Sequence, residues 1–147
     1  MPKRVPGIMP LYMLALFATA LLLGAMVFFS FIVLPVAHRK LEPMAARRFV
    51  RALFPVYYRT IAVLGTIAAI SLMAVGDRLL ASAMAFVAVL AAFVDLGLRP
   101  RIYSLQDATQ WGDDDARPVF RRLHRLSVLI NLAQIAAAAV VLLALSY

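Results

Sequence analysis

The chain has 147 residues, of which 65% are hydrophobic and only 15% charged, and its mean hydropathy is +0.91. This composition excludes an ordinary soluble domain, which needs a larger polar surface. The formal net charge of +8 does not indicate a nucleic-acid partner, because the basic residues flank apolar segments and form no basic domain of their own. The lack of cysteine excludes disulfides, thiolate metal sites and cysteine nucleophiles.

The first apolar segment, residues 11–37, contains no charged residue and exceeds the roughly 20 residues that cross a hydrocarbon core. Lys3 and Arg4 precede it, as basic residues precede the apolar part of a secretory signal, and Ala18-Thr19-Ala20 resembles a cleavage site. The strong hydrophobicity nevertheless continues far beyond that site. We therefore expect an uncleaved membrane span.

The second and third apolar segments, residues 56–75 and 79–98, are separated only by Gly76-Asp77-Arg78. Such a short polar break predicts a tight turn, and so a hairpin of two membrane helices. Arg99-Pro100 predicts the end of the third helix, because proline disfavours a helical residue before it and has no backbone N–H to donate.

Two further helices are expected around these spans. Between the first two spans, a segment that begins at Glu42-Pro43 and ends at Phe54-Pro55 has apolar residues four apart and arginines on the other face, which predicts a short interfacial amphipathic helix. The acidic cluster at 113–115, followed by Pro118, is typical of a helix start. That helix should contain the fourth span, residues 126–146.

The predicted fold is therefore all-α: one membrane domain, residues 1–147, with a bundle of four transmembrane helices. Orientation follows from the distribution of Lys and Arg, which favours the cytoplasmic side. Lys3, Arg4 and Arg78 lie on one side. The loops on the other side and their flanks hold twelve basic residues: Arg39, Lys40, Arg47, Arg48, Arg51, Arg59, Arg99, Arg101, Arg117, Arg121, Arg122 and Arg125. This bias predicts a bacterial inner-membrane protein with cytoplasmic loops and both termini periplasmic.

Ionisable and amide side chains at membrane depth are the candidate functional residues, because they are costly there unless they have partners. On the fourth helix, His124, Ser127, Asn131 and Gln134 share one face, which Arg117 and Arg121 extend. If the bundle is compact, a shared polar vestibule at the cytoplasmic ends of the helices is expected. The candidate ligand-binding residues in it are His124, Ser127, Asn131, Arg121, Asp95, Arg99, Tyr57 and Tyr58.

Structural interpretations of these residues stay open beside the functional one. Asp95 and Arg99, four apart, can be a simple ion pair on one helix face. Hydroxyl and amide groups also join membrane helices without any ligand. Tyr57 and Tyr58 could belong to an interfacial aromatic belt.

Cofactor sites have weaker support. His38 and His124 share one side and could in principle ligate haem or a metal, but they lie at the membrane boundary. Methionines near the outer ends of the helices could bind cuprous copper or simply fill the core: Met9, Met13, Met73 and Met84. Neither pattern justifies a predicted cofactor or metal. No catalytic motif occurs, so we expect no enzyme activity.

Three segments carry a family resemblance. They are Gly24-Ala-Met-Val-Phe-Phe-Ser-Phe-Ile-Val-Leu-Pro35, Leu53-Phe-Pro-Val-Tyr-Tyr-Arg59 and Leu123-His-Arg-Leu-Ser-Val-Leu-Ile-Asn131. Together they resemble a family of small four-helix bacterial membrane proteins of unknown function, related to eukaryotic transmembrane protein 205, and more distantly the membrane domain of copper-resistance proteins. The resemblance implies structural roles for Gly24, Phe29, Pro35, Phe54 and Pro55, and marks Tyr57, Tyr58, His124, Ser127 and Asn131.

Two functions are compatible with these observations. Short loops and small-residue helix faces favour a non-enzymatic accessory or interaction subunit, whose partners would be the lipid bilayer and another membrane protein or a second copy of the chain. The alternative is a protein that binds or transports a small molecule or metal ion in a cytoplasm-facing polar cavity. Arginines at the cavity mouth would favour an anion.

Overall fold

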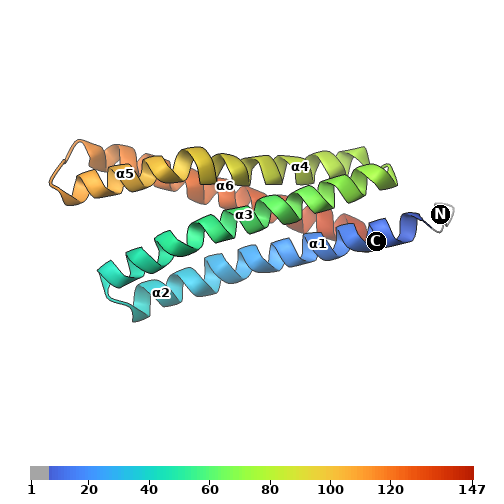
Figure 1. Ribbon diagram of the computed structural model, residues 1–147, viewed down its shortest axis with the longest axis horizontal. Coiled ribbons are helices and arrows are strands. Elements are labelled where there is room, and N and C mark those ends of the chain that lie inside the picture. Colours follow the sequence, from blue (N-terminus) through green and yellow to red (C-terminus); the bar gives the residue numbers. More distant parts are fainter. Residues whose placement is uncertain (1–6) are drawn as a thin grey trace.

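The computed structural model describes residues 7–147, so Lys3 and Arg4 lie outside the described part. Four long helical rods lie side by side (Figure 1). The first rod consists of α1 (Ile8–Phe28), the π-helical turn η1 (Phe29–Val33) and α2 (Leu34–Lys40). The second is α3 (Pro43–Val75). The third comprises α4 (Arg78–Phe93), the π-helical turn η2 (Val94–Leu98) and α5 (Arg99–Gln110), and the fourth is α6 (Ala116–Ser146).

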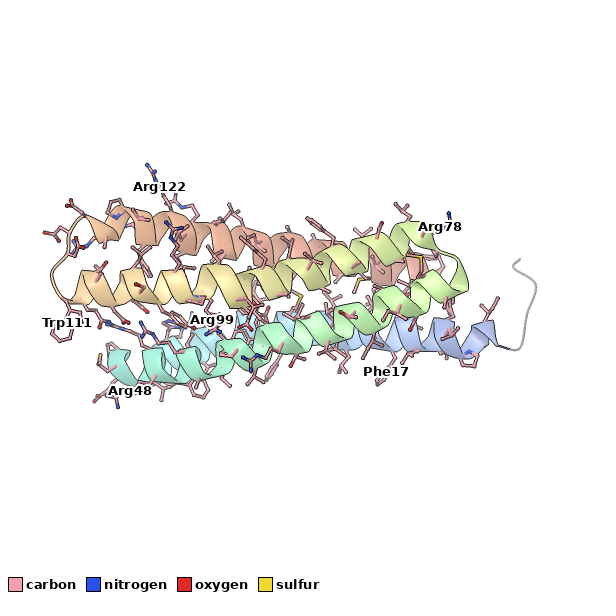
Figure 2. All side chains as sticks on the ribbon, turned by 45° about the horizontal axis from the view of Figure 1, so that its top comes forward. Phe17, Arg48, Arg78, Arg99, Trp111 and Arg122 are labelled. Atoms are coloured by element: carbon pink, nitrogen blue, oxygen red, sulfur yellow. The ribbon has the colours of Figure 1, made fainter. Side chains whose placement is uncertain are left out.

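All four rods are long and apolar enough to cross a membrane: Ile8–Lys40, Pro43–Val75, Arg78–Gln110 and Ala116–Ser146. Large apolar side chains such as Phe17 (68% exposed), Ile70 and Leu143 cover the outside of the bundle. Figure 2 shows Phe17 pointing away from the other helices. An apolar outer surface of this kind suits contact with lipid chains, and the predicted all-α bundle of four transmembrane helices is confirmed.

Three short connections join the rods. Gly76 ends α3 with φ +95°, a conformation that glycine adopts without a Cβ penalty. The Asp77 carboxylate then accepts a hydrogen bond of 3.1 Å from the Leu80 backbone N–H and caps α4. Asp113 accepts from the backbone N–H groups of Asp115 and Ala116 at the start of α6. The predicted turn at residue 76 and the predicted helix start after the acidic cluster are both confirmed.

Two predicted helix ends are wrong. The segment from Pro43 to Phe54 is no separate interfacial helix, because α3 continues through Pro55 without a break. The third rod likewise continues beyond Pro100 to Gln110. A proline ring disturbs a helix by clashing with the preceding turn, but membrane helices tolerate it where neighbouring helices and a local π turn compensate.

The π turns show how this works at two of the prolines. The Leu34 N–H donates to the Phe29 carbonyl, directly before Pro35, and the Arg99 N–H donates to the Val94 carbonyl, directly before Pro100. Each wider turn lies just where a proline ring would crowd a regular α-helical turn. The rod therefore continues past each proline.

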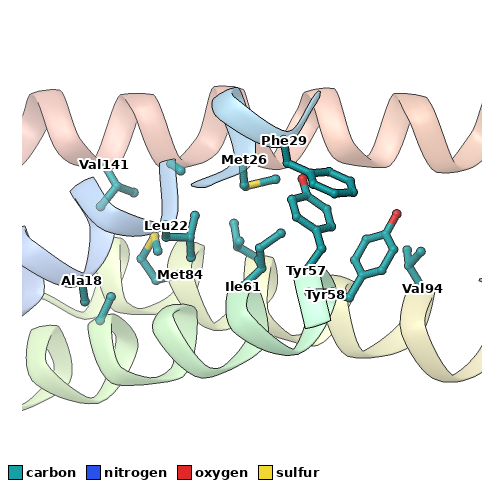
Figure 3. Close-up of a cluster of buried hydrophobic side chains, with 14 of the residues drawn as sticks. Ala18, Leu22, Met26, Phe29, Tyr57, Tyr58, Ile61, Met84, Val94 and Val141 are labelled. Atoms are coloured by element: carbon teal, nitrogen blue, oxygen red, sulfur yellow. The ribbon is translucent and has the colours of Figure 1, made fainter. Parts of the chain in front are cut away.

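The core runs along the middle of the bundle, where α1 packs between α3 and α6, and α4 packs between the same two helices on the other side. Leu22, Met26, Ile61 and Met84 are fully buried there (Figure 3). Gly65 brings α3 close to α4, since a Cβ added to it would lie 3.1 Å from the Cβ of Ala88. Gly24 has no such role, because it is exposed and nothing lies within 4 Å of an added Cβ.

The rods part at the end that carries the connections at 41–42 and 111–115, which we call the basic end. There α2 packs on α3 and α5 packs on α6, but neither α2 nor α3 makes more than marginal backbone contact with α5. Arg48, Arg99, Trp111 and Arg122 all lie toward this end in Figure 2, whereas Arg78 lies at the other. The backbones of the two helix pairs thus lie close together at one end and further apart at the basic end.

Candidate functional site

A pocket of about 270 Å³ lies where the two helix pairs begin to part. Its walls come from all four rods, and most of the lining is aromatic or aliphatic. Each rod contributes at least one polar side chain, and the fourth contributes three. The lining residues are Phe29, Ser30, Phe31, Leu34, Phe54, Tyr57, Tyr58, Val94, Arg99, Ile102, Tyr103, His124, Ser127, Val128, Asn131 and Leu132.

Six of the eight predicted ligand-binding residues line this pocket. Tyr57, Tyr58, Arg99, His124, Ser127 and Asn131 lie in its wall. Asp95 does not line it but binds Arg99, which does. Arg121 is exposed and is no part of the lining. Helical periodicity places Arg121 on the same face as His124, but the pocket does not extend to this turn of α6, so the prediction of Arg121 as a lining residue is wrong.

Aromatic rings form one wall of the pocket. Phe29 stacks on Tyr57 with ring centroids 4.2 Å apart, and Phe54 stacks on Tyr58 at 5.7 Å. The two tyrosine rings meet edge to face at 5.1 Å. Both tyrosines are buried, and Figure 3 shows Tyr57 beside Phe29 inside the bundle. The alternative of a lipid-facing aromatic belt is therefore wrong for Tyr57 and Tyr58.

A chain of hydrogen bonds connects three rods at the floor of the pocket. The Tyr57 hydroxyl donates to Asn131 Oδ1 at 2.6 Å, and Asn131 Nδ2 donates to the Ser30 hydroxyl at 2.9 Å. Ser30 lies in η1, so the π turn places its hydroxyl toward α6. Every polar atom of the Asn131 side chain thus has a partner, as a polar group at membrane depth requires.

Gln134, the fourth residue on the polar face of α6, has a structural role. Gln134 is 1% exposed and donates through Nε2 to the Val87 carbonyl at 2.9 Å. It joins α6 to α4, one turn deeper in the bundle than Asn131. Because it does not line the pocket, we assign it to packing between helices.

Asp95 and Arg99 form the predicted ion pair, with Arg99 Nη2 2.8 Å and Nε 3.0 Å from Asp95 Oδ1. Arg59 approaches the other carboxylate oxygen at 3.5 Å. The Asp95 side chain is only 5% exposed, so the two guanidinium groups compensate a buried charge. One carboxylate between two arginines leaves a formal charge of +1 beside the pocket.

The two histidines differ in position. His124 lines the pocket, and its ring stacks on Phe120 with centroids 5.8 Å apart. His38 is exposed, with Nδ1 2.7 Å from the Leu34 carbonyl of its own helix, and does not line the pocket. Within residues 7–147 no three His, Cys, Asp or Glu side chains come close enough to hold a metal ion. Of the four outer methionines, Met84 is in the core, whereas Met9, Met13 and Met73 are exposed.

A second polar cluster bridges the two helix pairs at the basic end, and sequence reasoning missed it. Arg51 of α3 binds Asp107 of α5 with Nη2 2.6 Å from Oδ1 and Nη1 3.3 Å from Oδ2. Nη2 also donates to Gln106 Oε1 at 2.9 Å. The Arg51 guanidinium lies 4.7 Å from the centroid of the Tyr103 ring.

The signal for this cluster was present in the sequence. Asp95, Arg99, Tyr103 and Asp107 are spaced four apart, which is one face of a helix. The prediction that the helix ends at Arg99-Pro100 concealed the pattern. Ser30 and the pocket wall at Ile102 gave no comparable signal, because contacts between distant segments place them there.

The comparisons with known proteins locate the family but no activity. Residues 17–110 match DUF4149, described as a domain of unknown function. The match covers more than half of the chain and includes the aromatic wall, Asp95 and Arg99, but it ends before His124, Ser127 and Asn131 of α6. No curated protein and no solved structure matches the chain.

Proposed function

Because the chain belongs to DUF4149, a family of unknown function, its activity has to follow from its own geometry, and we propose that it binds a small molecule without catalysing a reaction. The pocket of about 270 Å³ carries this proposal. Ligand sites are concave, mostly apolar and equipped with a few convergent polar groups. The aromatic wall together with Arg99, His124 and Ser127 has this character.

The surroundings of the pocket agree with a binding role. Asp95 does not line the pocket and positions Arg99. Asn131 does line it, but both polar atoms of its side chain are already paired within the protein. Arg99 and His124 keep side-chain surface in the pocket. The alternative of a metal-ion ligand has no donor cluster among the described residues to support it.

An accessory or interaction subunit is the second candidate. A shallow apolar groove between α4 and α6, floored by Ala83, Ala136 and Ala137, favours it. Small residues let another membrane helix approach closely. The occupant of this groove would be another membrane protein or a second copy of the chain.

The proposal includes the location and orientation of the protein. Twelve of its 15 Lys and Arg residues belong to the basic end, which supports an inner-membrane protein of bacteria with this end in the cytoplasm and both termini periplasmic. We also propose the relation to eukaryotic transmembrane protein 205. The three motif segments and the four-helix architecture support it.

Native mass spectrometry of the protein extracted gently from its own membrane tests the binding proposal. We expect one small molecule per chain in the unmodified protein. Ser127→Trp should remove it by filling the pocket, whereas Ala133→Trp, an exposed position on the same helix outside the lining, should retain it. His124→Ala should weaken retention by about fivefold, the worth of one hydrogen bond, and His38→Ala should not.

Two other results would decide against this function. A stoichiometric protein partner without any small molecule would establish the accessory-subunit candidate. A bound molecule that Ser127→Trp and Ala133→Trp retain equally would place the binding site outside the pocket and overturn its assignment.

A further inference from the structure

The lining of the pocket reaches the lipid-facing surface of the bundle. Its lining includes Phe31 of η1 and Val128 and Leu132 of α6, which are 60%, 44% and 46% exposed. Large apolar side chains on the outside of a transmembrane bundle face acyl chains. A molecule in the pocket can therefore extend an apolar chain between η1 and α6 into the bilayer.

The size of the pocket agrees with partial enclosure. About 270 Å³ is slightly below the volumes typical of sites that enclose a drug-sized molecule. It is enough for the headgroup of a lipid and the first part of its chain. The rest of the chain would lie along the exposed apolar surface.

The charge of the pocket selects the headgroup. Of the described residues in its lining, Arg99 alone carries a formal charge. Asp95 engages Arg99 through Nε and Nη2, and Nη1 takes no part in this pairing. The Asp95 carboxylate is occupied on both oxygens, by Arg99 and Arg59, and does not line the pocket. The pocket therefore offers a cation and no free carboxylate.

Two neutral polar residues lie in the same lining as this cation. They are His124 and Ser127, whose hydroxyl donates to the His124 backbone carbonyl at 2.8 Å and keeps its oxygen as an acceptor. The ring of Tyr103 forms the wall next to Arg99. The Tyr103 hydroxyl is buried and has no hydrogen-bond partner among the described residues. A buried hydroxyl without a partner costs free energy, which an anionic oxygen brought next to Arg99 could recover.

Resting on the proposed binding function, we infer that the ligand is an acyl lipid with an anionic headgroup, a carboxylate or a phosphate bound by Arg99, and that its chain leaves between η1 and α6. The arginines and lysines of the basic end add a positive electrostatic potential, which attracts an anionic headgroup. Cationic and neutral amphiphiles lack the negative charge that Arg99 selects. A free fatty acid and an anionic phospholipid share the recognised chemistry.

The test uses the full-length protein in phosphatidylcholine nanodiscs and measures retained probe by native mass spectrometry. Oleate and its neutral counterpart oleyl alcohol form one pair of probes, and phosphatidylglycerol against phosphatidylcholine forms the other. We expect each anionic probe that fits to be retained at least tenfold better than its partner, because a charge-assisted hydrogen bond contributes that much. Retention of oleate alone would identify a free fatty acid as the ligand. Retention of phosphatidylglycerol would identify an anionic membrane lipid.

Arg99→Gln should abolish this preference, whereas Arg101→Gln, an exposed arginine two residues further along the same helix, should preserve it. Because Arg99→Gln leaves Asp95 with Arg59 as its one partner, Asp95→Asn combined with Arg99→Gln removes the buried carboxylate together with the charge in the pocket lining, and it should give the same loss. Leu132→Trp should weaken retention of oleate by closing the lateral opening.

Equal retention of charged and neutral probes would overturn the inference. So would a loss of the anionic preference in Arg101→Gln as large as that in Arg99→Gln. Such results would leave the binding function intact if native mass spectrometry still shows a neutral molecule lost with Ser127→Trp. If no small molecule is retained under any condition, both proposals fail.

Discussion

Asn131 connects three rods through one side chain, since it accepts from Tyr57 and donates to Ser30. Polar contacts between membrane helices are individually modest, with measured couplings averaging about 0.6 kcal/mol. Their geometric effect is larger here, because they fix the rotation of η1 and α6 about the pocket. These hydrogen bonds thus hold the wall of the pocket in place, since all three residues line it.

A double-mutant cycle on Tyr57→Phe and Asn131→Ala tests this connection. We expect Asn131→Ala to lower the free energy of unfolding in detergent by roughly 1–2 kcal/mol, because it leaves the Tyr57 hydroxyl without a partner. Tyr57→Phe should cost less. The double variant should be more stable than additivity predicts by about 0.6 kcal/mol. Strict additivity would show that the hydrogen bond contributes nothing to stability.

At the scale of the helical elements, Gly65 sets the distance between α3 and α4. A larger side chain must push Ala88 away, since even a Cβ lies 3.1 Å from it. We expect Gly65→Leu to destabilise the protein by about 1–3 kcal/mol through overpacking. Gly24→Leu is the matched control, because its side chain would extend into open space and should leave the thermal midpoint nearly unchanged. Equal effects of the two substitutions would contradict close packing at Gly65.

The π turns act at this scale too. η1 and η2 both end two residues before a proline, and both contribute residues at the level of the pocket. η1 supplies Phe29 and Ser30, and η2 supplies Val94 and the nearby Asp95. The prolines therefore shape the wall of the pocket instead of ending helices.

At the scale of the whole molecule, the rods part at the basic end and the Arg51–Asp107 ion pair closes the gap between the helix pairs. The pocket lies next to this bridge, because Tyr103 both contacts Arg51 and lines the pocket. A ligand that comes from the membrane would enter sideways and leave the bridge intact. The orientation of the bundle then decides which leaflet supplies it.

A topology reporter tests that orientation. A reporter active only in the cytoplasm should function when inserted near Gln110 at the basic end, and should be inactive when fused after Tyr147. The physical reason is the excess of arginine and lysine at the basic end, which is retained on the cytoplasmic side. An active fusion after Tyr147 together with an inactive insertion near Gln110 would reverse the orientation and assign the pocket to the outer leaflet.

The sequence by itself determined the class of the protein and the number and approximate position of its spans. Long uncharged apolar segments have only one stable solution in lipid, because every backbone polar group must be satisfied within the helix. The turn at Gly76 and the capped start of α6 are likewise local, since glycine and aspartate act on their immediate neighbours. Helical periodicity correctly placed His124, Ser127 and Asn131 on one face of α6, and topology brought Tyr57, Tyr58 and Arg99 to the same level of the bundle.

Only the tertiary structure decided where the helices really end, which polar residues meet and where the pocket opens. Pro55 and Pro100 looked like helix ends because proline is a local breaker, yet packing against neighbouring helices and the π turn at η2 outweighs that preference. The same packing keeps Arg121 and His38 out of the pocket lining and brings Ser30 and Tyr103 into it. It also places Arg51 beside the pocket, where it binds Asp107. Contacts between rods depend on the rotation of each helix about its axis, which no single segment of sequence specifies.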